Sequence, residues 1–202
     1  MVDGTDQAIV RQVIEGDFEA FGVLVSKYQD RIYSAIRNYV SNPDDAVDIT
    51  QDAFVKAYSK LRSFDASSAF YTWLYRIAFN LAISRQRRQR PTVSVEHARD
   101  VLGHEPVDRA DPPGARLEQE ERACQVREAM AALSDEHRSI LVLREVEGCA
   151  YEEIAEILEL PVGTIRSRLH RARLQLRDQL QGLVQQDASE AKPERTPNRT
   201  RS

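Results

Sequence analysis

Residues 151–173, YEEIAEILELPVGTIRSRLHRAR, decide the fold of the C-terminal part of the chain. They have the spacing of two helices joined by a short turn, with the small Ala155 where the helices would cross and Ile165 as an apolar anchor ten residues later. Pro161 suits the first turn of the second helix, where a missing N–H costs little. An apolar stripe follows at four- and three-residue steps: Ile165, Leu169, Ala172, Leu176 and Leu180. The pattern predicts a helix-turn-helix.

The remaining faces of the second helix carry side chains suited to DNA. Between residues 162 and 177 there are five arginines and no acid. Arginine can bond guanine with two hydrogen bonds, and serine and further arginines can hold phosphates. Such a helix enters the major groove with its N-terminal half against the base edges. An amphipathic helix that is basic by chance is the alternative. The candidate DNA-binding residues are Arg166, Ser167, His170, Arg171 and Arg173.

The rest of the chain is predicted to be helical as well. Apolar residues recur at steps of three and four over residues 21–39, 46–61 and 70–81. Several shorter helices follow after residue 118, and no window alternates convincingly with period two. The sequence therefore predicts an all-α fold.

Proline marks the boundary between two small helical domains. Four of the eight prolines fall within residues 91–113, where the apolar periodicity lapses. We therefore expect a first domain at 5–90, a flexible linker at 91–117 and a second domain at 118–184. The polar segment 185–202 contains two prolines and lacks periodicity, and we expect it to be a disordered tail.

One face of the helix predicted near residues 70–81 is polar and basic. Its members follow at steps of four and three: Thr72, Arg76, Asn80, Ser84 and Arg87. Tyr71, Tyr75 and Phe79 form a second row, which we expect the core not to need. Aromatic rings that stack, an amide that reads an edge and arginines that hold backbone suit unstacked bases. Packing of the aromatics against neighbouring helices is the alternative.

The helix predicted at residues 46–61 carries an acidic stripe near its start. Asp45, Asp48 and Asp52 fall at steps of three and four, with Gln51 beside them. Acid preference near a helix N-terminus explains the first of these, but it explains Asp52, two turns in, less well. A solvated face and a basic protein partner remain equal interpretations of the stripe.

Composition excludes several classes of protein. No stretch of the 202 residues approaches the ~20 apolar residues that span a bilayer. The acidic N-terminus has no hydrophobic signal region, so we expect a cytoplasmic protein with reduced thiols at Cys124 and Cys149. The four histidines and two cysteines lack metal-ligand spacing, and neither a phosphate-binding glycine loop nor a nucleophile elbow occurs. We expect no enzyme, metal, cofactor or small-molecule substrate. The net charge of −4 also indicates weak DNA binding by the chain alone.

Three segments together resemble one protein family. They are DDAVDITQDAF at 44–54, AFYTWLYRIAFN at 69–80 and PVGTIRSRLHRAR at 161–173. In order and separation they resemble the extracytoplasmic-function (ECF) sigma factors of the sigma-70 family, with the envelope-stress sigma E subgroup nearest. The resemblance runs over about residues 5–182.

The resemblance implies a transcription initiation factor that binds bacterial core RNA polymerase and directs it to promoters in response to a stress or envelope signal. Its first domain would be sigma region 2, which docks on the β′ clamp helices and melts the −10 element. Its second would be region 4, which reads the −35 element and touches the β flap. The implied polymerase-binding residues are Asp45, Asp48, Gln51 and Asp52. The implied −10 residues are Phe64, which with the following loop takes a flipped base, and Asn80, which reads that base. We assign Arg76, Ser84 and Arg87 to the −10 element with them, because they share the polar face of Asn80. An anti-sigma factor, often membrane-bound, commonly covers the polymerase-binding surfaces.

Two positions depart from the sigma E subgroup. Ser84 stands where the subgroup tends to have an amide, and His170 stands where it has an aromatic residue. The promoter sequence that the sigma E subgroup recognises therefore cannot be transferred to this chain. The rival hypotheses are a stand-alone helix-turn-helix regulator, which would bind duplex DNA tightly without polymerase, and a pure interaction adaptor, in which the arginines would be dispensable.

Overall fold

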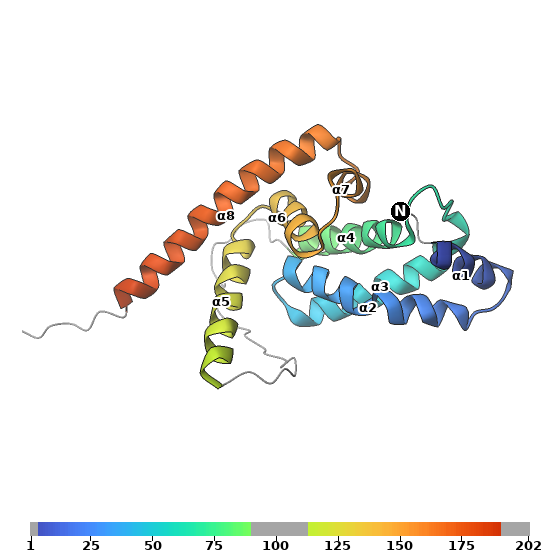
Figure 1. Ribbon diagram of the computed structural model, residues 1–202, viewed down its shortest axis with the longest axis horizontal. Coiled ribbons are helices and arrows are strands. Elements are labelled where there is room, and N and C mark those ends of the chain that lie inside the picture. The colour runs from blue at the N-terminus through green and yellow to red at the C-terminus, as the bar shows by residue number, and fades with distance from the viewer. Residues whose placement is uncertain (1–3, 90–112, 191–202) are drawn as a thin grey trace, which may run out of the picture.

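The computed structural model describes residues 4–89 and 113–190, and over these ranges it contains helices and no strands. The all-α prediction is confirmed. Residues 91–112 of the predicted linker and 191–202 of the predicted tail lie outside the described residues. The elements in chain order (Figure 1) are α1 (Gly4–Glu15), α2 (Ala20–Tyr39), α3 (Pro43–Lys60), the short 3-10 turn η1 (Leu61–Ser63), α4 (Phe70–Gln89), α5 (Pro113–Ala131), α6 (Asp135–Leu141), the short π-helix η2 (Val142–Val146), α7 (Tyr151–Leu158) and α8 (Val162–Glu190).

Helices α1–α4 form the first module, a bundle in which α2, α3 and α4 contact one another. Leu24, Ile32 and Ile36 of α2 are fully buried in it. The small side chains of Ala53 and Ala57 let α3 approach its neighbours closely. The start of α3 is fixed by Asn42, Pro43 and Asp44, because the Asn42 side chain accepts a hydrogen bond of 2.9 Å from the Asp44 N–H and proline suits the first helical position.

Helices α5–α8 form the second module, with α8 packed against α5, α6 and α7. Ser134 caps α6 by accepting a hydrogen bond from the His137 N–H. The Glu153 carboxylate accepts a hydrogen bond of 2.7 Å from the Ala150 N–H at the start of α7. Of the apolar stripe predicted on α8, Ile165, Leu169 and Ala172 are buried, and Leu176 and Leu180 are half-buried.

Two predicted boundaries are wrong. Helix α5 begins at Pro113, so residues 113–117 are helical where a linker was expected. Helix α8 continues to Glu190, so residues 185–190 are helical where a disordered tail was expected. Proline suits the first turn of a helix. The glutamines and alanine of 185–190 are good helix formers, and the next proline stands only at Pro193.

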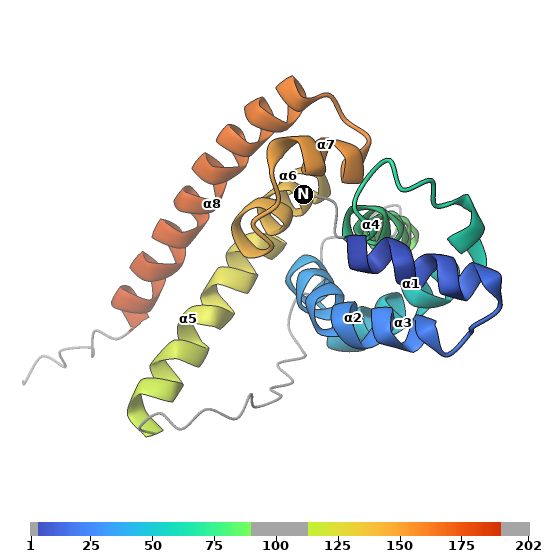
Figure 2. The same ribbon diagram turned by 45° about the vertical axis from the view of Figure 1, so that its right-hand side comes forward.

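The two modules pack directly on one another. Helix α7 crosses α4 and packs against it (Figures 1 and 2). Helix α2 contacts η2 and α5. The buried apolar residues of both modules form one continuous core, running from Val10 of α1 to Ala172 of α8. The described part of the chain is therefore a closed arrangement of two modules.

Candidate nucleic-acid and polymerase interfaces

Helix α8 has an apolar face and a separate basic face. Ile165, Leu169 and Ala172 are at most 2% exposed. The five predicted DNA-binding residues are all exposed: Arg166, Ser167, His170, Arg171 and Arg173. They occupy the N-terminal half of the helix, which is the half that contacts base edges when a recognition helix enters a major groove.

The turn between α7 and α8 orients this basic face. Glu159 adopts the left-handed conformation with φ 55°, and the Leu160 N–H donates to the Ala155 carbonyl at 2.9 Å. The Thr164 N–H then donates to the Pro161 carbonyl at 2.8 Å and begins α8. Backbone hydrogen bonds thus fix the crossing of the two helices that the sequence predicted.

The basic side chains of α8 differ in their partners. Arg173 pairs with Glu145 at 2.6 Å, and the Arg166 guanidinium lies 5.7 Å from the centre of the Tyr151 ring. Arg171 forms no ion pair or ring contact with another described residue. An exposed ion pair stabilises by about 1 kcal/mol or less, so Arg173 can exchange Glu145 for a phosphate.

The acidic stripe on α3 divides into an exposed and a buried part. Asp48, Gln51 and Asp52 are exposed. Asp45 is buried, and its carboxylate lies 2.7 Å from the Arg85 guanidinium of α4. Arg85 also lies 3.0 Å from Asp48, and hydrogen bonding to Asp48 is the main cause that raises the pKa of Arg85. Asp45 therefore joins α3 to α4, and three of the four predicted polymerase-binding residues remain on the surface.

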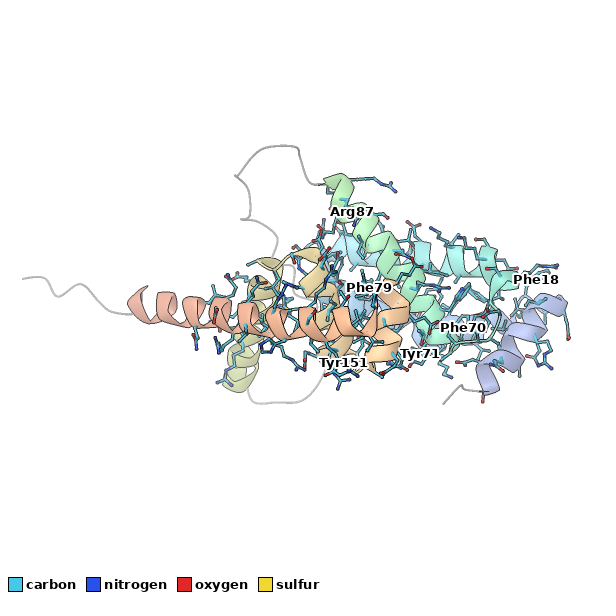
Figure 3. The ribbon with its side chains drawn as sticks, turned by 90° about the horizontal axis from the view of Figure 1, so that it is seen from above. Phe18, Phe70, Tyr71, Phe79, Arg87 and Tyr151 are labelled. Atoms are coloured by element: carbon cyan, nitrogen blue, oxygen red, sulfur yellow. The ribbon has the colours of Figure 1, made fainter. Side chains whose placement is uncertain are left out.

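Four of the five residues predicted for the −10 element lie along α4. Asn80, Ser84 and Arg87 are exposed and Arg76 is half-buried. Arg87 stands near the C-terminal end of α4 and extends away from the body of the molecule (Figure 3). The row therefore offers an amide, a hydroxyl and guanidinium groups to a ligand along one helix.

Phe64 is placed differently from the prediction. It is only 9% exposed, and its ring centre lies 5.7 Å from that of Phe70 and 5.4 Å from that of Trp73. The following loop is held by Asp65, which accepts hydrogen bonds from the Ser67 N–H and hydroxyl; these bonds lower the pKa of Asp65. Phe64 thus anchors the loop in the core, and its ring is not available to a base in this arrangement.

Comparison with protein families identifies both modules. Sigma-70 region 2 matches residues 24–92, and Sigma-70 region 4 matches residues 125–176. The chain belongs to the sigma-70 family. The match to region 2 covers most of the first module, and the match to region 4 covers the helix-turn-helix, so the modules are called region 2 and region 4 from here on.

Curated relatives place this sigma factor among the ECF type. It is 40% identical to the ECF RNA polymerase sigma-E factor of Haemophilus influenzae over 194 residues, which cover 89% of this chain and 97% of the relative. It is also 40% identical to the RNA polymerase sigma-H factor of Pseudomonas aeruginosa over 186 residues, which cover 90% and 96%. The chain is a non-enzymatic transcription initiation factor whose regions 2 and 4 bind core RNA polymerase and promoter DNA.

Two solved structures that are similar to this sigma factor contain a second protein. One is CnrH with the cytosolic domain of CnrY, at TM-score 0.65 and 28% identity, covering 88% of this chain and 97% of that one. Another is the sigma factor RpoE with the anti-sigma factor NepR from Bartonella quintana, at TM-score 0.64 and 25% identity, covering 80% and 96%. The similarity spans both modules in each case.

The aromatic row predicted to face nucleic acid is part of the sigma factor's core. Tyr75 and Phe79 are fully buried, and Tyr71 is half-buried. The Phe79 ring stacks on Tyr75 at 6.4 Å and lies 5.6 Å from the Tyr39 ring. The prediction that the core does not need Tyr75 and Phe79 is therefore wrong. Periodicity along α4 alone gave no sign that region 4 packs against this helix.

Two charged residues between the regions were missed by sequence reasoning. Arg138 of α6 is buried, and Glu147, which directly follows η2, has a side chain only 6% exposed. Arg138 stands before the apolar run ILVL at 140–143, and a charge beside such a run is a weak signal of a buried, paired group. No comparable signal marks Glu147.

Two features that would indicate other chemistry are absent from residues 4–89 and 113–190. No group of three or more histidine, cysteine, aspartate or glutamate side chains there could hold a metal ion. None of the described helices is both long and apolar enough to cross a membrane.

Proposed function

We propose that this sigma factor reads the −35 element with Arg166, Ser167, His170 and Arg171, with Arg173 on an adjoining phosphate. The observation that carries the proposal is the exposed, acid-free basic face of α8, opposite the buried Ile165, Leu169 and Ala172. An arginine that makes two hydrogen bonds to guanine gives base specificity. The remaining arginines contact phosphates and so fix the position of the helix on the DNA backbone.

Docking on core polymerase is assigned to the exposed part of the α3 stripe, namely Asp48, Gln51 and Asp52. These side chains point to solvent on a helix whose other side is packed against α2 and α4. They fit a basic helical surface such as the β′ clamp helices. Asp45 lies beneath the stripe and forms an ion pair with Arg85, which also pairs with Asp48.

Recognition of the −10 element is assigned to Asn80, with Ser84, Arg76 and Arg87 along the same helix. The loop after Phe64 takes the flipped base, and Phe64 acts by anchoring that loop. Asn80→Ala should impair promoter opening, measured by permanganate reactivity of unpaired thymines, and leave binding of core polymerase unchanged.

An anti-sigma factor is the proposed regulator, because one structure similar across both regions, that of RpoE with NepR, is a complex of that kind. We place the sigma factor in the cytoplasm with polymerase, under control of a stress or envelope signal. A membrane-bound inhibitor would hold it at the inner membrane.

Run-off transcription from a panel of promoters tests the proposal as a whole. The chain alone should bind each promoter weakly, and core polymerase with the chain should start at specific sites. Asp48→Arg should abolish co-purification with core polymerase. Tight site-specific DNA binding without polymerase, or normal co-purification of Asp48→Arg, would contradict these assignments.

A further inference from the structure

One tyrosine ring lies between two arginines of the helix-turn-helix module. Tyr151 is the first residue of α7, and its half-buried side chain packs against the core. The Arg166 guanidinium of α8 lies 5.7 Å from the centre of the Tyr151 ring, which Figure 3 labels. The Arg144 guanidinium of η2 lies 4.9 Å from the same ring centre. Both distances fall within the ~6 Å over which an aromatic ring attracts a cation.

The backbone around Tyr151 is fixed by local hydrogen bonds. Arg144 is half-buried, and its guanidinium donates a hydrogen bond of 2.7 Å to the Cys149 carbonyl, just before Tyr151. The Ala150 N–H donates to the Glu153 carboxylate at 2.7 Å, which completes the first turn of α7. The Tyr151 ring therefore starts from a defined backbone position and has Arg144 held against it.

Arg166 has no comparable support of its own. Its side chain is exposed, and it forms no ion pair or side-chain hydrogen bond with another described residue. Arg173 differs, because Glu145 accepts two hydrogen bonds from its guanidinium. A long side chain that is ordered only on binding loses rotamer freedom, which weakens the binding. The contact with Tyr151 orders Arg166 before the DNA arrives.

The ring also keeps two like charges close together. The guanidinium groups of Arg144 and Arg166 repel one another, and no carboxylate of the described residues pairs with either of them. The electron-rich face of the Tyr151 ring offsets part of this repulsion. Without the ring, Arg166 would be free to turn away from Arg144.

We propose that Tyr151 is a positioning residue for promoter reading, which holds the Arg166 guanidinium in the orientation that reaches a base edge of the −35 element. The inference rests on the proposed role of Arg166 at that element. Tyr151 acts through Arg166, so its contribution should disappear when Arg166 is removed. At an exposed site, a contact between a cation and a ring changes affinity by about two- to fivefold.

A cycle of double variants tests the inference in the full chain with core polymerase. Tyr151→Leu and Tyr151→Met both remove the ring and keep an apolar side chain against the core, so one folded variant of the two suffices. Tyr151→Phe keeps the ring and removes only the hydroxyl. Each change is also combined with Arg166→Ala and, as the matched control, with Arg171→Ala, at an exposed arginine without a ring contact. Thermal unfolding by circular dichroism verifies that each variant is folded.

The measurement is the holoenzyme concentration that gives half-maximal binding to a promoter with an intact −35 element. Tyr151→Leu should raise this concentration by about two- to fivefold, and Tyr151→Phe should leave it close to the wild-type value. In the Arg166→Ala background, Tyr151→Leu should add no further loss. In the Arg171→Ala background, the full loss should persist, because residues that do not act on each other contribute additively.

Four results would overturn the positioning role. Wild-type binding by Tyr151→Leu is the first. Equal losses from Tyr151→Leu with and without Arg166 would show that the ring has a purely structural role. A loss in Tyr151→Phe as large as in Tyr151→Leu would show that the hydroxyl matters and the ring does not. Wild-type binding by Arg166→Ala would remove the proposed reading role of Arg166 together with this inference, whereas the first three results leave that role intact.

Discussion

At the scale of single residues, Arg171 offers the clearest test of DNA reading, because among the described residues it pairs with no carboxylate. Arg171→Ala should weaken use of the −35 element by about 1–3 kcal/mol if the side chain makes two hydrogen bonds to guanine. Promoter titrations with holoenzyme measure this cost, and Gln179→Ala, an exposed change farther along α8, is the control. The loss should vanish on a promoter with a disrupted −35 element. An equal loss on both promoters would indicate a contact without base specificity.

The buried thiol of Cys149 predicts loss of stability at high pH. Burial raises the pKa of Cys149 from 9.0 to about 11. The unfolded chain therefore loses this proton first, so the group's contribution to stability is complete below about pH 9 and is lost as the pH rises towards about pH 11. The loss should amount to about 3 kcal/mol.

Urea unfolding across this range measures the pH dependence of stability. Cys149→Ala should flatten the fall, and Cys124→Ala, which alters the half-buried thiol of α5, should leave it unchanged. The readout is the slope of the unfolding free energy against pH. The absolute stability is not used, because alanine at position 149 also changes the packing. A fall of the same steepness in Cys149→Ala would refute the assignment.

At the scale of elements, α3 carries an apolar residue within its acidic stripe. Val55 is 69% exposed and follows Asp48, Gln51 and Asp52 at helical spacing on the same face. If this face docks on polymerase, the interface buries Val55 as well. Val55→Ser should then weaken core binding by about 1 kcal/mol, the value of partial burial of a valine.

Competition with labelled wild-type chain for core polymerase measures the effect of Val55→Ser. The control is Val126→Ser, another exposed valine, on α5 of region 4. The loss should persist at high salt, because screening weakens charge pairs and leaves apolar burial intact. Equal affinities for the two serine variants would limit the interface to the polar part of the stripe.

The elements themselves were largely predictable from sequence. Spacing alone assigned three residues to the buried side of α8, namely Ile165, Leu169 and Ala172. This was possible because the apolar residues of an amphipathic helix mark the side that packs against the core. Spacing also placed Asn80 and Ser84 on an exposed face. It could not show that Asp45 turns inward to Arg85, since that depends on where α4 crosses α3.

At the scale of the whole molecule, Arg138 should govern how the regions unfold together. Arg138→Met keeps an apolar stem but removes the donors to the Tyr39, Met130 and Leu133 carbonyls. Loss of these hydrogen bonds from a buried guanidinium should cost about 3 kcal/mol in the free energy of unfolding. Urea unfolding followed by circular dichroism measures the loss, and Arg62→Met, at an exposed arginine of η1, should show none. A stability equal to that of wild type would contradict the bridging role of Arg138.

The packing of the two modules against each other is the feature of the fold that could least be predicted from the sequence. Two domains were expected, and two modules are present, but their contact depends on residues distant in sequence. Tyr75 and Glu147 are 72 positions apart, and Arg138 and Tyr39 are 99 apart. No periodicity or local spacing reports such pairs. Tyr75 of α4 was misassigned for the same reason, because its hydroxyl is bonded to Glu147 of the other module.

The continuous core that joins the regions bears on their use as interchangeable parts. A chimaera that grafts a foreign promoter-reading half onto residues 4–89 would place unmatched side chains against Tyr75. Engineers of orthogonal transcription systems would therefore do best to transplant Tyr39, Tyr75, Arg138 and Glu147 as one set, or to expect hybrids whose two halves no longer pack together.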